Sequence, residues 1–137
     1  PWRPAVRLRF GATRASLAAL ILAAPAAHAA GRPSLECYFQ TTLRDPAYQK
    51  KAFEKVAAKW KTPPPDQIPA VGKKAVVQAV ITKDGALATT EVSMSSGKKG
   101  WDAAALRAVK TAAPFDPLPA GFGYPSVQVH FHVSVVP

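Results

Sequence analysis

Alternating hydrophobic and polar residues near the end of the chain give the clearest structural signal. Hydrophobic residues occupy every second position from Val127 to Val135, and the positions between them are polar. Because successive side chains of a strand point to opposite sides, this alternation predicts a β-strand with one buried and one accessible face. The accessible face would carry Gln128, His130, His132 and Ser134.

Two earlier segments alternate in the same way and are joined by a short turn. They cover residues 73–82 and 88–94, with Asp84-Gly85 between them. Aspartate followed by glycine between two such runs is a strong hairpin signal, because glycine readily takes the positive φ that a tight turn needs. The inward-facing residues are expected to be Ala75, Val77, Ala79 and Ile81 in the first strand, and Ala88, Thr90, Val92 and Met94 in the second.

Two further segments have the spacing of amphipathic helices. The first is expected to follow Asp45-Pro46, an N-cap and a first helical residue, and to run to about Trp60. Its buried stripe would be Phe53, Val56, Ala57 and Trp60, with Lys51, Lys55 and Lys59 on the opposite side. The second would have Asp102 in its first turn, and Pro114 would end it. Its buried stripe would be Trp101, Ala105, Ala108, Val109 and Ala112.

These elements predict one α+β domain. We expect a three-stranded antiparallel sheet with two helices packed on one face, so that the other face meets water. The proline-rich segment 62–70 would connect the first helix to the hairpin. A chain of 137 residues is too short for two domains with separate cores.

The first 29 residues have the composition of a secretory signal peptide. Four arginines precede a short apolar run at residues 16–24, and Ala27-His28-Ala29 offers small residues for cleavage. The run is shorter than the roughly 20 residues of a spanning helix, so cleavage before Ala30 is favoured over a retained anchor. We therefore divide the chain into a signal peptide (1–29), a short N-terminal segment (30–44) and the folded domain (45–137).

The charge balance changes the range of expected partners. The whole chain has a formal net charge of +10, and cleavage would leave 14 basic and 8 acidic residues, a net charge of +6. Export to the periplasm argues against nucleic acid, so anionic envelope surfaces, peptidoglycan or acidic protein segments fit better. The charge could also serve solubility alone.

Few residues suggest catalytic or metal chemistry. His130 and His132 could share a metal with Glu91 or Asp116 as a third ligand, but two histidines on a strand are weak evidence. Ser95 and Ser96 lie in a turn without the glycine-rich setting of a nucleophile. Cys37 is the sole cysteine, and burial is the simplest interpretation of it. We predict a protein that is not an enzyme and has no cofactor or metal.

Several motifs in order resemble the C-terminal domain of the TonB and TolA family of periplasmic proteins. They are Asp84-Gly85, Ser95-Ser96-Gly97, the run Asp102-Ala103-Ala104-Ala105 and the exit segment from Pro114 to Pro119. The resemblance extends from about Tyr48 to Val135 and covers nearly all of the part that we expect to fold.

The resemblance implies a periplasmic protein-interaction domain. Domains of this family bind segments of envelope proteins, including outer-membrane receptors, as an added strand, and the last strand serves this purpose in TonB. Carried over by position, the partner-binding residues would be Gln128, His130, His132 and Ser134. After cleavage we expect no stable membrane insertion, and a homodimer is compatible with the open sheet edges. The alternatives are an energy transducer anchored by an uncleaved leader and a metal-dependent hydrolase that uses the two histidines.

Overall fold

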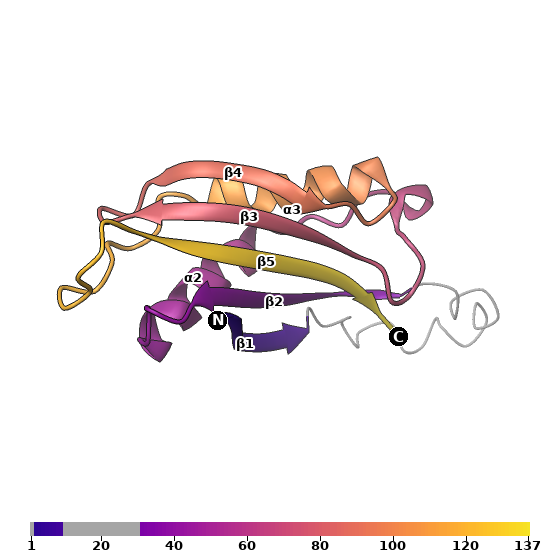
Figure 1. The fold of residues 1–137 in the computed structure, drawn as a ribbon. Helices are drawn as coiled ribbons and strands as arrows, with labels where there is room; N and C mark the ends of the chain where they lie inside the picture. Colours follow the sequence, from indigo (N-terminus) through magenta and orange to yellow (C-terminus); the bar gives the residue numbers. More distant parts are fainter. Residues whose placement is uncertain (1, 10–30) are drawn as a thin grey trace.

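The computed structural model describes residues 2–9 and 31–137, which form one antiparallel sheet covered by helices on one face (Figure 1). The sheet contains five strands in the order β1-β2-β5-β3-β4. The strands are β1 (Trp2–Arg9), β2 (Arg32–Gln40), β3 (Lys74–Thr82), β4 (Leu87–Met94) and β5 (Ser126–Val136). The α+β class and the single helical layer are as the sequence predicted.

Both helices begin and end close to the expected residues. Helix α2 spans Pro46–Lys59, and the Asp45 side chain accepts a hydrogen bond from the Tyr48 amide at 3.0 Å, as an N-cap does. Helix α3 spans Lys99–Ala112 and buries every residue of its predicted stripe. The proline-rich connector between α2 and β3 contains one short 3-10 turn, η2 (Pro65–Gln67).

The strand count is the main correction to the predicted fold. Residues 30–44 were expected to be a short leading segment, but Arg32–Gln40 forms β2 and pairs antiparallel with β5. Its buried residues Leu35, Cys37 and Phe39 alternate, so the period-two signal is present in the sequence. The part of the chain from residue 31 onward therefore contributes four strands.

The fifth strand comes from within the predicted signal peptide. Trp2–Arg9 pairs antiparallel with the outer edge of β2, with Trp2 opposite Gln40 and Arg9 opposite Ser34. The rest of the predicted signal peptide, including its apolar run and cleavage site, lies outside the described residues.

Irregularities in β4 correct the expected positions of two side chains. Ala88 was predicted to face the core but is exposed, and Leu87, which pairs with Ile81 after a register shift, packs against the core instead.

Met94 was also predicted to face the core, but its side chain is 52% exposed. The register between β3 and β4 shifts, because Val76 pairs with Met94 whereas Val77 pairs with Val92. One extra residue, Ser93, reverses the side of the sheet on which the following side chain lies.

The core lies between the sheet and the two helices. Trp101 of α3 is fully buried there, and its ring meets Trp60 edge-on with a centroid distance of 4.9 Å. Cys37 is also fully buried, as expected, and burial raises the pKa of its thiol well above the ordinary value.

Candidate functional site

The four predicted binding residues lie together on the open face of the sheet. Gln128, His130, His132 and Ser134 alternate in β5 with the buried residues that face the helices. The strand that carries them has no free edge, because β2 pairs along one side of β5 and β3 along the other. The expectation that the last strand offers its backbone to a partner is therefore wrong for this fold. The side chains themselves remain candidates for contact with a partner.

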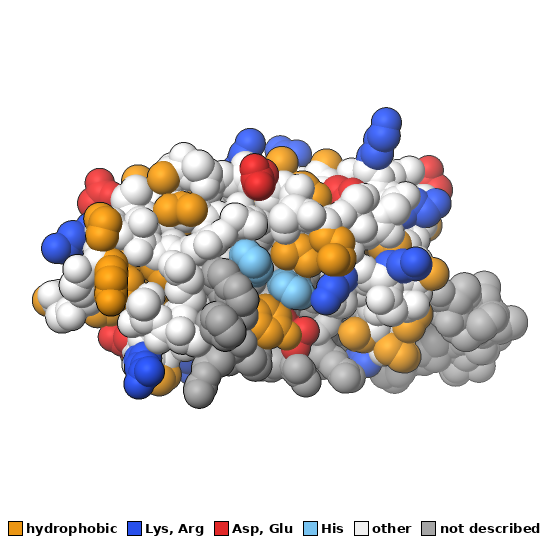
Figure 2. Space-filling view, in the orientation of Figure 1, with side chains coloured by type: hydrophobic (Ala, Val, Ile, Leu, Met, Phe, Trp, Pro, Cys, Tyr) orange, Lys and Arg blue, Asp and Glu red, His pale blue; other side chains and the backbone are white. Residues whose placement is uncertain are grey.

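Three residues of neighbouring strands complete a cluster around the two histidines. The Tyr38 and His132 rings have centroids 4.5 Å apart, and the His130 and His132 rings are stacked at 6.5 Å. Val76 pairs with His132 on one side and Met94 on the other. We call Tyr38, Val76, Met94, His130 and His132 the open-face patch. Figure 2 shows its histidines side by side with hydrophobic atoms next to them.

Val76 and Met94 were missed by the sequence analysis. Val76 is only 4% exposed although it points away from the helices. Its residue type gave no sign of the face on which it lies, and the register shift at Ser93 brings Met94 beside it. The patch thus combines aromatic, imidazole and aliphatic surface on a face that no helix covers.

Burial controls the charge of the histidines. Desolvation, together with the smaller effects of Lys74 and His130, lowers the pKa of His132 to about 4, although Glu36 acts in the opposite direction. Desolvation also lowers the pKa of His130. Both imidazoles are therefore neutral at neutral pH, and the patch has aromatic rather than cationic character.

Acidification from pH 7 to about pH 4 is expected to lower the thermal unfolding midpoint of the protein. The unfolded chain protonates position 132 near the ordinary pKa of 6.5, but the folded chain does so only near 4. Between these values the unfolded state binds more protons, so stability present above pH 6.5 is lost as the pH falls. Circular dichroism melts across this range measure the effect. His132→Gln should flatten the profile, and an unchanged profile would contradict the assignment.

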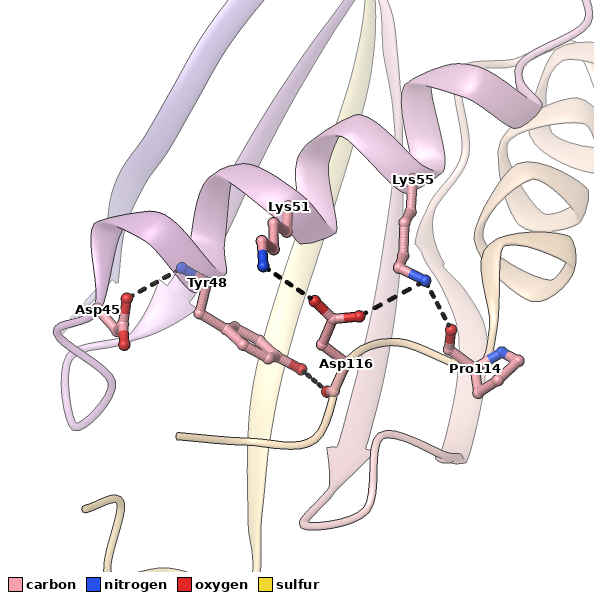
Figure 3. A network of polar contacts seen from close by, with 6 residues as sticks. All are labelled: Asp45, Tyr48, Lys51, Lys55, Pro114 and Asp116. Atoms are coloured by element: carbon pink, nitrogen blue, oxygen red, sulfur yellow. Dashed lines mark hydrogen bonds and ion pairs between the residues drawn. The ribbon is translucent and has the colours of Figure 1, made fainter. Parts of the chain in front are cut away.

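The predicted third metal ligands are not brought to the histidines. Asp116 lies on the helical side of the sheet, where its carboxylate oxygens are 3.7 Å from Lys51 Nζ and 3.8 Å from Lys55 Nζ (Figure 3). Glu91 is separated from His130 by Gln78, which pairs with both residues across β3. In the part of the chain that the structure describes, no three His, Cys, Asp or Glu residues are grouped to hold a metal ion.

The contacts of Asp116 instead fix the exit from α3 against α2. The Tyr48 hydroxyl donates to the Asp116 carbonyl at 2.7 Å, and Lys55 donates to the Pro114 carbonyl at 3.2 Å (Figure 3). Burial, together with the negative charge of Asp116, raises the pKa of Tyr48 to about 12. Two of the three lysines expected to face solvent therefore also have a structural role.

The serines of the Ser95-Ser96-Gly97 turn serve the fold. Asp102 accepts hydrogen bonds from the Ser96 amide at 2.8 Å, from the Ser96 hydroxyl at 2.7 Å and from the Ser95 hydroxyl. The carboxylate thereby fastens the end of β4 to the first turn of α3. This role accounts for the residue types without a nucleophile.

The outer edge of β2 is the place where the sheet takes up an extended segment. Residues 2–9 pair there over most of the length of β2. β2 itself is fixed, because Leu35, Cys37 and Phe39 are fully buried in the core. At the opposite edge, β4 pairs only with β3 among the described strands, and its register is interrupted by two shifts.

Comparison with known proteins agrees with this architecture. Within the described ranges, no helix has the length and apolar character required to cross a membrane. No curated protein and no solved structure matches the chain. The family model described as TonB C terminal matches residues 45–131, which is more than half of the chain. The chain therefore belongs to the family of TonB C-terminal domains.

Proposed function

We propose that this protein is an exported, periplasmic interaction domain that binds an extended segment of an envelope or outer-membrane protein along the outer edge of β2. Domains of this family are non-enzymatic interaction modules of the cell envelope, with a role in transport. Strand addition is the binding mode that suits an antiparallel sheet with an exposed edge, because main-chain hydrogen bonds supply affinity without requiring a particular sequence.

The pairing of Trp2–Arg9 with β2 is the single observation that carries this proposal. An eight-residue extended segment already lies along this edge in antiparallel orientation, with one register shift between Pro4 and Arg7, so the edge accommodates a strand. We infer that removal of residues 1–29 as a signal peptide vacates the edge. A partner segment would then occupy the place of β1.

The other end of the sheet is less suitable for the same role. Register shifts beside Val77 and Ile81 disturb the ladder of β3 and β4, and such irregularities are typical of edges protected against pairing. The ladder of β2 with β5 has no register shift from Arg32 to Phe39, and its ladder with β1 has one, between Pro4 and Arg7. A regular strand offers an added segment a continuous row of amides and carbonyls.

The open-face patch would contact side chains of the partner segment. Alternate residues of an added strand point to the open face, where Tyr38 stands next to the added strand and the histidines stand one strand further in. Gln128, His130, His132 and Ser134 thus remain proposed contact residues, through their side chains and not through their backbone.

Site-specific photocrosslinking in the native envelope tests the proposed edge. Glu36 on β2 and Glu91 on β4 are matched positions, because both are glutamates on the open face of strands near opposite ends of the sheet. A photoreactive residue at position 36 is expected to crosslink an extended segment of an envelope protein, with little product from position 91. Crosslinking confined to position 91 would overturn the proposal.

Two controls connect the crosslink to strand addition. A synthetic copy of the crosslinked segment should bind the protein, and N-methylation of alternate residues should abolish binding if ladder hydrogen bonds hold it. Intact mass of the same protein should give a chain that begins at Ala30. A chain that retains residues 1–29 and still crosslinks at position 36 would show that β1 does not define the partner site.

A further inference from the structure

A groove on the helical side of the molecule is rimmed by positive charge. It lies between the end of α2, the proline-rich connector and α3, and it has a volume of about 320 Å³. It is lined by Lys59, Lys61, Thr62, Pro63, Pro64, Gly100, Ala103, Ala104 and Arg107. Three of these nine residues are cationic and none is acidic.

The cations of the groove differ from the lysines earlier in α2. Lys51 and Lys55 pair with Asp116, but Lys59, Lys61 and Arg107 form no ion pair within the described residues. The only carboxylate of α3 is that of Asp102, and it already accepts hydrogen bonds from Ser95 and Ser96. The positive charge of the groove is therefore available to a ligand.

The whole helical layer shares this sign. Most basic residues of the chain after residue 30 lie on the two helices or directly beside them: Lys50, Lys51, Lys55, Lys59, Lys61, Lys98, Lys99, Arg107 and Lys110. The acidic residues on the helices or beside them are fewer: Asp45, Glu54, Asp66, Asp102 and Asp116. An anionic partner would thus be attracted to this side of the molecule before it contacts the groove.

The walls of the groove are held in place in the absence of a ligand. The Gly100 amide donates to the Gln67 side chain at 2.8 Å, which ties the connector to the start of α3. The Trp60 indole donates to the Thr62 hydroxyl at 2.9 Å, and its ring packs against Trp101. Binding would therefore require little reordering of the protein.

We propose that this groove binds an acidic peptide segment of an envelope protein. The lining favours a peptide over a compact anion, because it combines three cations with the apolar side chains of two prolines and two alanines. Pro63 and Pro64 have no amide proton, so recognition would depend on side-chain charge and apolar contact. The groove and the outer edge of β2 are separate surfaces, so the two sites bind different segments.

Binding of a labelled peptide of alternating glutamate and alanine tests the proposal. The protein that begins at Ala30 and the full chain are both titrated by fluorescence anisotropy. Lys61→Glu with Arg107→Glu should weaken binding by about tenfold or more, since two attractive charges become repulsive. Lys73→Glu with Lys83→Glu changes the net charge equally at exposed positions away from the groove and should weaken binding less than about threefold.

The comparison between the two variants decides the result. Equal weakening in both would mean that the peptide responds to net charge alone and would overturn the site. Competition by inorganic phosphate at the same molar concentration as the peptide would show an anion site instead of a peptide site. Unchanged thermal midpoints of both variants confirm that the fold is intact. The outcome is independent of crosslinking at position 36.

Discussion

Trp101→Ala is expected to lower the free energy of unfolding by about 3–5 kcal/mol, the range for removal of a large aromatic side chain from a core. Trp101 is 0% exposed and is the largest fully buried side chain among the described residues. Its ring packs against Trp60, and its indole nitrogen donates to the Val133 carbonyl of β5 at 3.0 Å. The substitution therefore removes both the packing against Trp60, where α2 meets the connector, and the hydrogen bond to the sheet.

Urea unfolding followed by circular dichroism measures this effect, with the same slope assumed for both proteins. Trp101→Phe is the matched control, because it keeps an aromatic ring in the core but loses the hydrogen bond to Val133. It should lose clearly less stability than the alanine variant. A loss below about 1 kcal/mol for Trp101→Ala would refute the packing of α3 against the sheet.

Gly85→Ala should be the second most damaging of the substitutions considered, with an expected loss of about 2–5 kcal/mol. Gly85 has a φ of 94°, where a side chain is disfavoured. A β-carbon added there would also lie 2.0 Å from the Phe115 carbonyl oxygen. The Phe115 amide donates to the Gly85 carbonyl at 2.8 Å, so the exit segment cannot move away without breaking this contact.

Gly97→Ala separates the cost of the positive φ from the cost of the contact between the added β-carbon and Phe115. Gly97 has a nearly identical φ of 96°, but nothing lies within 4 Å of an added β-carbon. Its substitution should cost only the conformational part, about 1–2 kcal/mol. Equal losses at positions 85 and 97 in urea melts would mean that the hairpin does not press against Phe115.

The hairpin, its turn and both helices could be predicted because their signals are local. The stripe of α3 from Trp101 to Ala112 is buried in full, and Asp45 caps α2 as expected. A helix requires only the correct spacing within one segment. The Asp-Gly turn likewise depends on two residues, and its glycine has the positive φ that was predicted.

The candidate site could be predicted only in part. The polar face of β5 was found from its alternation, but the edge beside it was assigned incorrectly because β2 was missed. β2 pairs with a strand far later in the chain, since Arg32 is opposite Val136, which is 104 residues further on. No pattern within β2 identifies which strand it pairs with when that strand is so distant in the sequence. The reversal of Met94 depended on one extra residue in β4, which alternation alone does not reveal.

The sequence by itself determined the buried faces of α3 and β5, since burial follows the period of the pattern where no extra residue interrupts it. It also determined the order of motifs that places the chain in the TonB C-terminal family. Only the tertiary structure decided which strands are neighbours, and hence that β5 is central and that β2 offers its outer edge. The physical reason is that a side-chain pattern specifies the face of a strand, whereas its hydrogen-bonding edges are common to every sequence and are assigned by long-range packing.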